Sequence, residues 1–445
     1  MKSLNELAAE MKRDWDERAR ENAKWFINTF KVEQTEAEFE ASCLNDMRVN
    51  VQAVLPTLTW GRAARALRLL EIGCGIGRMT APLAHLFGEV HGVDVSGEMI
   101  RQGRERLKHL SNVFFYETNG IDFSSFPPDY FEIIFSAYVF QHLPDKEVIR
   151  ANLRDAYRVL APGGVIRFAS AGVTNSAYEA MEKNTWTGAS FAESDSRQIA
   201  RELGAQLVSL HGSGTQYFWT MLRKPLPAES PQAPLKMQAV GRADNFAVKE
   251  IPTRGEQALL GLAITGLSAE SVDCNNLSVE WQGKITYPIY VGPEFQTSTN
   301  NQGEAIIIKL PVPTDLTDGV TEIRLNLPGG TSLSATINIV PSPIAPPVMM
   351  QYSNALDAGL DIHTTGPKSV IRVFALGLEG AVTVENTLIH LGELALHPAV
   401  VSFLPANGAW EIRAQLPSGT PAQTTHISVS HEGRRSLTEP LVIQE

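Results

Sequence analysis

The segment Glu71-Ile72-Gly73-Cys74-Gly75-Ile76-Gly77 has the residue types and spacing of a loop that holds a ligand against the main chain. Glycine adopts backbone conformations that are closed to other residues, and it lets a bound molecule approach the chain closely. The loop follows an apolar run and precedes the amphipathic stretch GRMTAPLAHLF, so its N–H groups would lie at the start of a helix. The segment therefore predicts the floor of a cofactor pocket.

The spacing of the glycines discriminates between cofactors. A dinucleotide-binding fingerprint requires G-x-G-x-x-G, but Arg78 occupies the sixth position here. The pattern is instead Gly73-x-Gly75-x-Gly77, with the acidic Glu71 two residues before the first glycine. No partner for hydride transfer is evident either, so the sequence disfavours an NAD-dependent oxidoreductase.

The same pattern resembles motif I of the class I S-adenosylmethionine (SAM)-dependent methyltransferases. SAM carries no pyrophosphate, and its cationic ammonium and sulfonium groups favour acidic and carbonyl partners. The resemblance implies that SAM is the cofactor and that it is contacted by Glu71, Gly73, Cys74, Gly75 and Gly77.

An acidic residue at the end of the second apolar run supports the resemblance. Asp94 lies in GVDVS, beside Val95, where the family uses a carboxylate to accept hydrogen bonds from both ribose hydroxyls. A carboxylate suits this task because it has two acceptor oxygens and no donor. The other interpretation is that Asp94 caps the helix that starts near Ser96.

Further segments follow in the order of the family. Asn119 and Gly120 stand where the family's Asp-Ala-type pair contacts the adenine edge, with Asp122 as an alternative and a simple Asn-Gly turn as the other interpretation. FEIIFSAYVFQHLPD (131–145) resembles motif IV, and RDAYRVLAPGGVIRF (154–168) resembles the turn before the fifth strand. The resemblance implies that Ser136 and Ala137 flank the methionyl end of SAM, because ligands of open α/β sheets bind beyond the carboxyl ends of the strands.

Methyl transfer from a sulfonium is an in-line displacement, and a protonated oxygen or nitrogen acceptor also needs a base. His142, just past the fourth apolar run, is the candidate base, although a QHLPD capping turn would also place a histidine there. Tyr138 is a candidate for lining the methyl channel. The chain shows no carboxylate cluster of the kind that metal-dependent members use, so we predict no metal.

Two flanking segments are candidates to complete the site. The helical N-terminus, with Trp15 and Phe26, would fold over SAM as a lid or simply pack on the core. The segment 184–224 would close the domain with a helix and a final hairpin, LVSLHG and QYFWTMLRK. Side chains there that could face an acceptor are His211, Gln216, Tyr217 and Trp219.

The elements that would position these residues alternate along the first half of the chain. Short apolar runs at 67–73, 89–95, 112–117, 131–136 and 164–170 are separated by amphipathic helical patterns. Such alternation predicts an α/β Rossmann-like domain with a mostly parallel central sheet and helices on both faces.

The second half has a different character. After the Pro-rich stretch KPLPAESPQAPLK (224–236), short β-type runs are punctuated by Gly, Pro and Asn, and PSPIAPP (341–347) divides them into two blocks. The two blocks resemble each other: IIIKLP…EIRLNLPGG aligns with WEIRAQLP…HISVSHEG. The predicted organisation is a methyltransferase domain at 1–225, a linker at 226–237, and immunoglobulin-like sandwiches at 238–343 and 344–445.

Composition bounds the partners and the compartment. A chain of 445 residues suggests about three domains, and a formal net charge of −11 argues against nucleic acid or an anionic membrane as main partner. Three scattered cysteines (Cys43, Cys74, Cys274), no signal-peptide pattern and no long apolar stretch predict a cytoplasmic protein.

The leading functional hypothesis is a methyltransferase that acts on oxygen or nitrogen of a small-molecule or glycan-like acceptor. The alternative is a non-catalytic SAM-binding sensor or scaffold whose sandwiches do the binding. The sandwiches carry no recognisable chemistry and are candidates for scaffolding, self-association or recognition of a polymeric acceptor.

Overall fold

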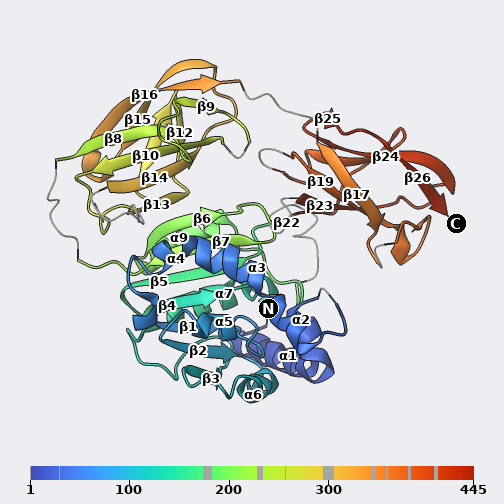
Figure 1. The fold of residues 1–445 in the computed structure, drawn as a ribbon, viewed down its shortest axis with the longest axis horizontal. Helices are drawn as coiled ribbons and strands as arrows, with labels where there is room; N and C mark the ends of the chain where they lie inside the picture. The colour runs from blue at the N-terminus through green and yellow to red at the C-terminus, as the bar shows by residue number, and fades with distance from the viewer. Residues whose placement is uncertain are drawn as a thin grey trace.

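The structure, a computed structural model, describes residues 2–29, 31–173, 183–227, 234–255, 257–293, 305–341, 347–356, 359–378, 382–404 and 409–444. An α/β unit extends from the N-terminus to Arg223, and two all-β sandwiches follow it (Figure 1). The predicted fold class is therefore confirmed.

The α/β unit is built on a mixed sheet. Its strands are β1 (Arg68–Ile72), β2 (Glu89–Asp94), β3 (Val113–Glu117), β4 (Phe131–Ser136), β5 (Leu160–Ser170), β6 (Gln206–His211) and β7 (Phe218–Arg223). They lie in the order β3-β2-β1-β4-β5-β7-β6, with β1 to β5 parallel and β7 antiparallel to β5 and β6. The five predicted strands and the closing hairpin are confirmed.

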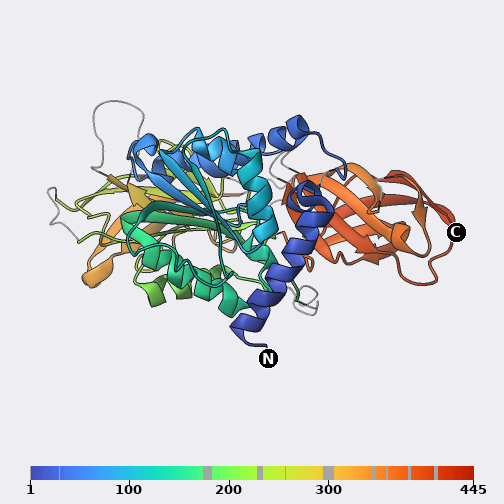
Figure 2. The same cartoon turned by 90° about the horizontal axis from the view of Figure 1, so that it is seen from below.

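Helices cover both faces of this sheet (Figure 2). They are α1 (Leu4–Ile27), α2 (Glu36–Ala41), α3 (Leu44–Asp46), the π-helix η1 (Met47–Val51), η2 (Gln52–Val54), α4 (Leu55–Leu58), η3 (Ala64–Ala66), α5 (Thr80–Ala84), α6 (Gly97–Arg106), η4 (Phe140–His142), α7 (Lys146–Val159) and α9 (Glu193–Leu203). None of the helices in the described ranges is both long enough and apolar enough to cross a membrane.

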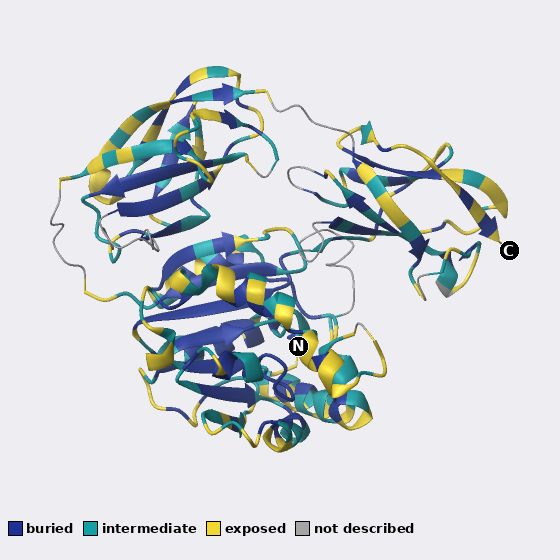
Figure 3. Ribbon diagram, in the orientation of Figure 1, coloured by how far each residue is buried: buried dark blue, intermediate teal, exposed yellow. Residues whose placement is uncertain are grey.

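Alternate residues of β1 show why the strands are almost continuously apolar. Leu69 packs in the cluster that includes Val51 and Leu83, whereas its neighbour Leu70 packs in the cluster that includes Leu153 of α7. Because successive side chains of a strand point to opposite faces, both faces of the sheet are buried (Figure 3). The sheet is thus a rigid platform whose strand ends carry the candidate site.

The two sandwiches have the same strand arrangement. In the first, the strands β8 to β16 form the two sheets β8-β10-β14-β13 and β9-β16-β15-β11-β12. In the second, β17 to β26 form β17-β19-β23-β22 and β18-β26-β24-β20-β21. This distribution of strands between two sheets is that of immunoglobulin-like sandwiches. The internal resemblance seen in the sequence matches β14 with β23 and β15 with β24, which hold equivalent places.

The strands of the first sandwich are β8 (Lys236–Arg242), β9 (Glu250–Pro252), β10 (Leu259–Thr265), β11 (Ser278–Trp281), β12 (Lys284–Thr286), β13 (Tyr290–Pro293), β14 (Ala305–Pro311), β15 (Gly319–Asn326) and β16 (Ser332–Val340), with the turn η5 (Pro328–Gly330). Those of the second are β17 (Val348–Asn354), β18 (Ile362–His363), β19 (Val370–Leu376), β20 (Thr387–Leu391), β21 (Leu394–Leu396), β22 (Val400–Leu404), β23 (Ala409–Gln415), β24 (Gln423–His431), β25 (Arg434–Arg435) and β26 (Glu439–Gln444), with the turn η6 (Pro367–Ser369). β8 begins inside the stretch expected to be a linker, of which 228–233 lie outside the described residues.

The first sandwich continues the sheet of the α/β unit, which the sequence did not predict. β13 pairs with the edge strand β6 through Tyr290 and Ser209, and Leu210 N donates to Ile289 O at 2.9 Å. The guanidinium of Arg223 on β7 also pairs with Glu270 at 2.5 Å. An edge strand that would otherwise expose unpaired backbone groups is thereby covered.

Candidate functional site

The glycine loop after β1 lines a deep cavity at the carboxyl ends of the parallel strands. Gly73 and Gly75 have positive φ angles of +70° and +53°. A Cβ added to Gly73 would lie 2.3 Å from Val139 Cγ2, and one added to Gly75 would lie 2.6 Å from Ile27 Cδ1. The loop therefore requires glycine for its conformation and for space, and it presents bare main chain to the cavity.

Asp94 ends β2 directly against this loop. One carboxylate oxygen accepts from Gly75 N and the other from Ser96 N, both at 2.9 Å. Burial raises the pKa of Asp94 to about 6. The N-cap of α6 is Ser96, whose Oγ accepts from Met99 N, so Asp94 is not that cap. Each of its oxygens keeps a lone pair for a ligand in the cavity.

Glu71 and Cys74 line the same part of the cavity and are buried. Glu71 Oε2 accepts from Thr80 Oγ1 at 2.5 Å, and burial raises the pKa of its carboxyl group to about 7. Burial also raises the pKa of the Cys74 thiol, which therefore stays neutral. Glu71 is the acidic group nearest in sequence to the glycines and is poised to ionise when a cation enters.

The part of the cavity beside the glycine loop and Asp94 is called the first compartment, and Gly120 lies at its far end. Gly120 lines the cavity with φ +76°, and its carbonyl oxygen accepts from Asn152 Nδ2 at 2.9 Å. Val95 lines it as well, at 3.0 Å from a Cβ added to Gly120. The side chain of Asn119 is exposed and engaged within its own turn: Oδ1 accepts from Ile121 N and Asp122 N, and Nδ2 donates to Asp122.

Two more of the predicted contact residues lie behind the cavity wall. Ser136 is buried, and its Oγ donates to Ile72 O at 3.1 Å. Gly77 has φ +87°, and a Cβ added there would lie 2.6 Å from Leu107 Cδ1. Ala137 does line the cavity. Ser136 and Gly77 thus hold the strand end and the loop in place from behind.

Tyr138 is held rigidly at the end of β4. It has a positive φ of +61°, which is uncommon for a residue with a side chain. Its hydroxyl donates to Asp46 Oδ1 at 2.7 Å and accepts from Asn50 Nδ2 at 3.1 Å, and Asp46 in turn pairs with Arg78 at 2.7 Å. Burial raises the pKa of Tyr138. Tyr138 is therefore a neutral wall of the cavity.

His142 lines the cavity from η4. Its Nδ1 lies 2.7 Å from the carbonyl oxygen of Trp186, so Nδ1 carries the proton, and Nε2 is the acceptor that receives a hydrogen bond from Gln141 Nε2 at 3.3 Å. Burial lowers the pKa of His142 to about 4. The ring packs on Trp15 and Trp186, with centroids 5.5 and 5.1 Å away. The imidazole is neutral near pH 7 and has a single defined acceptor atom.

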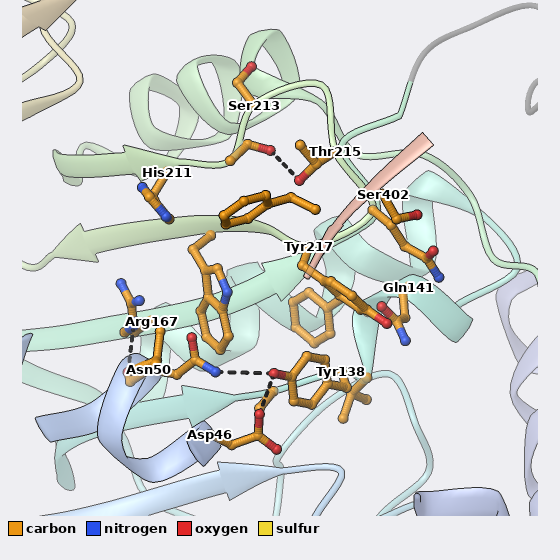
Figure 4. A pocket seen from close by; sticks show the side chains of 18 of the residues that line it. Asp46, Asn50, Tyr138, Gln141, Arg167, His211, Ser213, Thr215, Tyr217 and Ser402 are labelled. Atoms are coloured by element: carbon orange, nitrogen blue, oxygen red, sulfur yellow. Dashed lines mark hydrogen bonds between the residues drawn. The ribbon is translucent and has the colours of Figure 1, made fainter. Parts of the chain in front are cut away.

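A second compartment of the same cavity lies over β5, β6 and β7 (Figure 4). Arg167 on β5 contributes a guanidinium that lies 4.5 Å from the ring centroid of Trp219. Tyr217 meets Tyr138 edge to face at 5.2 Å. His211 and Gln216 complete this wall, so all four side chains that the sequence suggested from the final hairpin line the cavity.

The comparisons with known proteins agree with this geometry. Residues 69–164 match the family described as "Methyltransferase domain". The matched stretch contains the glycine loop, Asp94, Gly120 and His142. The chain contains a SAM-dependent methyltransferase domain.

Curated sequence relatives match about a quarter of the chain. The ubiquinone/menaquinone biosynthesis C-methyltransferase UbiE of Vibrio vulnificus is 32% identical over 114 residues, which are 24% of this chain and 42% of the relative. The protein of the same name from Shewanella oneidensis is 33% identical over 114 residues, 24% of this chain and 44% of the relative. The chain thus spans less than half the length of these curated relatives.

Solved structures are similar at lower identity. Phosphoethanolamine N-methyltransferase 1 of Haemonchus contortus, in complex with phosphoethanolamine and S-adenosylhomocysteine (SAH), is 18% identical over 52% of each chain, with a TM-score of 0.37. A SAM-dependent methyltransferase from Aquifex aeolicus is 17% identical, with a TM-score of 0.32, over 43% of this chain and 100% of that one.

The residues around the glycine loop fit SAM. The main chain of Gly73 and Gly75 lines the cavity without a side chain, and there is no space for a Cβ at either position. Asp94 offers two acceptor oxygens for the ribose hydroxyls. Glu71 offers a carboxylate toward the cationic groups of SAM. A pyrophosphate would lie beside the carboxyl groups of Glu71 and Asp94, so the negative charge of this part of the cavity suits SAM better than a dinucleotide.

Helix α1 lies against the same cavity. Asp16 Oδ1 accepts from Ser96 Oγ at 2.7 Å, and Arg18 donates to the carbonyl and hydroxyl oxygens of Thr185 at 3.0 Å each. Trp15 and Phe26 of the same helix line the cavity. The N-terminal helix therefore contacts both the start of α6 and the segment that carries Trp186.

The second sandwich reaches the outer end of the cavity. Ser402, Phe403 and Trp410 line it together with residues of the methyltransferase domain, and Figure 4 shows Ser402 at the wall that carries Gln141 and Tyr217. Burial raises the pKa of Tyr217, and the charge of Glu411 on β23 adds to this effect. The second sandwich thus forms part of the cavity mouth.

Sequence reasoning missed Asp46, Asn50 and Arg167. Asp46 and Asn50 lie in the short helical segment 44–54, which carries no motif. Arg167 had a visible signal, because it is the one charged residue in the apolar run GVIRFAS. A π-helix, η1, positions Asn50, as is common near functional sites.

We expect the affinity of the domain for SAM to rise as the pH rises from about 5 to about 8. The pKa of Asp94 is raised to about 6, and the carboxylate must be ionised to accept two ribose hydroxyls. Below that pKa, each pH unit should weaken binding by up to about tenfold, because SAM must displace a proton. Calorimetric Kd values across this range test the prediction; a Kd that does not change with pH would contradict it.

Proposed function

We propose that this protein transfers a methyl group from SAM to an oxygen or nitrogen of a small-molecule acceptor. The observation that carries the proposal is the continuity of one cavity, from the glycine loop and Asp94 to the wall formed by Tyr138, Arg167 and Trp219. A sensor would need the first compartment only. The second gives an acceptor a place beside the donor, and positioning supplies much of the rate enhancement in displacement reactions.

Different residues hold the donor, exclude water and accept the proton. When bound, SAM supplies an electrophilic methyl group on its sulfonium. The glycine loop and Asp94 hold the donor, and Trp15 and Trp186 exclude water from the space around His142. His142 Nε2 accepts the proton that an oxygen or nitrogen acceptor loses, and the acceptor replaces Gln141 Nε2 as the donor to this atom. The hydrogen bond from Nδ1 to Trp186 O fixes the tautomer that this requires.

Carbon is the second candidate for the acceptor atom. The UbiE relatives are named C-methyltransferases and share about a third of the residues over the 114 residues that match. A carbon acceptor would still use His142, since an activated carbon nucleophile also loses a proton. The two cases differ in the product, not in the residues of the chain.

Calorimetric titration of the full chain with SAM, SAH and NAD⁺ tests the donor. SAM and SAH should bind with a stoichiometry of about one per chain, because both carry the ribose hydroxyls that Asp94 accepts. NAD⁺ should bind weakly or not at all. Tighter binding of NAD⁺ than of SAM would contradict the proposal.

Replacing His142 with glutamine should lower kcat by about a hundredfold or more while leaving the Kd for SAM unchanged, since a positioned base contributes in that range. His109→Gln is the matched control, because His109 is exposed and does not line the cavity. At saturating SAM, the kcat of the wild-type protein should stay constant on the acid side down to about pH 5, because the pKa of His142 is lowered to about 4. A kcat at saturating SAM that falls by half near pH 6.5 would contradict this assignment.

A further inference from the structure

Arg167 differs from the other buried arginines of the described chain. Arg78, Arg150 and Arg223 are each less than 9% exposed, and each pairs with at least one carboxylate. Arg167 is 4% exposed, but no acidic side chain within the described ranges forms an ion pair with it. A buried charge without a counter-ion is unfavourable, so this one needs an explanation.

The contacts that Arg167 does make leave part of its guanidinium free. Its Nε donates to Asn50 O at 3.0 Å, and its plane lies near the ring of Trp219, 4.5 Å from the centroid. No described residue accepts a hydrogen bond from the two terminal nitrogens. Burial lowers the pKa of Arg167 to about 10, so the group stays charged at neutral pH. A cation with two free donors therefore lines the second compartment (Figure 4).

The walls around this cation are aromatic. Tyr138 meets Tyr217 at 5.2 Å and Trp219 at 6.3 Å, both edge to face, so the three rings form a corner. The next guanidinium along this wall, Arg78, is already neutralised by Asp46. Beside these rings the described residues therefore offer one positive charge without a carboxylate partner, together with apolar surface, which matches a single carboxylate on a flat body better than a dianionic phosphate.

We propose that the acceptor is a carboxylic acid with a flat, apolar body, and that its carboxylate pairs with the terminal nitrogens of Arg167. A guanidinium binds a carboxylate through two parallel hydrogen bonds, which fixes direction as well as position. Arg167 anchors the acceptor, and the rings of Tyr138, Tyr217 and Trp219 hold its body. This inference rests on the proposed function, because it takes the second compartment as the acceptor site.

The test uses the full chain with SAH bound, so that no transfer occurs. Benzoate and indole-3-acetate are compared with their neutral amides, benzamide and indole-3-acetamide, by calorimetry. Each acid should bind about tenfold tighter than its amide or better, which corresponds to one hydrogen-bonded charge. Arg167→Met should abolish the difference, and Arg167→Lys should keep part of it. The inference would be overturned if the amides bound as well as the acids, or if the acids did not bind. It would also be overturned if methylphosphonate bound tighter than both acids, or if the preference for acids survived in Arg167→Met.

A stability measurement separates an anchor from a structural arginine. Arg223→Met removes the partner of Glu270 and should lower Tm, because it leaves a largely buried carboxylate unpaired. Arg167→Met leaves no carboxylate unpaired, so Tm should stay the same or rise. An equal loss of Tm in both variants would overturn the inference. SAM titration of the same samples distinguishes the two proposals: absence of SAM binding rejects the proposed function, whereas SAM binding without acid preference rejects only the anchor.

Discussion

Replacing Asp94 with asparagine is expected to weaken SAM binding about a hundredfold, because two hydrogen bonds to a charged acceptor are worth about 3 kcal/mol or more together. Both oxygens of Asp94 already accept from backbone N–H groups, of Gly75 and of Ser96. An asparagine would turn its NH₂ group toward one of these donors, so the variant loses a ribose acceptor and also disturbs the glycine loop. Calorimetry with SAM and with SAH measures the effect.

The control for this variant is Asp122→Asn. Asp122 lies in the exposed turn next to Gly120 and does not line the cavity, so the same chemical change should leave the Kd for SAM within about twofold of that of the wild-type protein, as expected for a surface change of under 0.5 kcal/mol. Equal losses in both variants would show that Asp94 acts through general charge rather than through its hydrogen bonds. A loss of SAM affinity in the Asp122 variant alone would indicate that the 119–122 turn contacts the adenine.

Gly73→Ala is expected to abolish detectable SAM binding and to lower the free energy of unfolding by several kcal/mol. The new Cβ would lie 2.3 Å from Val139 Cγ2, and φ at this position is +70°. The left-handed conformation alone costs about 1–2 kcal/mol for a residue with a side chain, and the clash adds to it. The loop must shift toward the cavity, where SAM would lie. Urea unfolding and SAM titration of the same sample measure both effects.

Gly204→Ala provides the matched control. Gly204 ends α9 with φ +64°, but nothing lies within 4 Å of an added Cβ. This variant should therefore show the conformational cost of about 1–2 kcal/mol and bind SAM normally. If Gly204→Ala and Gly73→Ala lowered stability equally and both bound SAM, the loop would not be a cradle for the donor.

The fold was predictable because its signals are local. The apolar runs of the α/β unit are short and regularly separated by amphipathic stretches, so strands and helices follow from periodicity. The repeated pattern of the C-terminal half predicted two similar sandwiches, and equivalent strands such as β15 and β24 hold the matching segments. The pairing of β6 with β13 was not predictable, since it joins two edge strands with Ser209 and Tyr290 far apart in the sequence.

The site was predictable where chemistry depends on main chain and on strand ends. Gly73, Gly75 and Asp94 lie together because β1 and β2 are parallel neighbours whose carboxyl ends meet. Side-chain direction after a strand is a different matter. Ser136 and Ala137 are neighbours, but Ser136 lies behind the cavity wall and Ala137 lines the cavity. The side chain of Asn119, which the motif assigns to the adenine, forms hydrogen bonds within its own turn instead.

Arg167 shows what sequence alone leaves open. Its place in an apolar run marks a buried charge, but an arginine in a central strand is usually matched by a carboxylate from another element, as Arg223 is by Glu270. Only the structure shows that the elements packed over Arg167 bring a carbonyl oxygen and an aromatic ring instead.

The proposed function requires that this chain transfer the methyl group of SAM. The most direct measurement incubates the wild-type chain and Asp94→Asn with SAM that carries a deuterated methyl group and with a fraction of small carboxylic acids from a cell extract. Mass spectrometry then follows deuterated products and SAH. At a SAM concentration near the Kd of the wild-type chain, we predict a deuterated product and an equal amount of SAH with the wild-type chain, and far less of both with Asp94→Asn. SAM that binds in the cavity but yields no labelled product and no SAH above the variant would contradict the account and indicate a protein that only binds SAM.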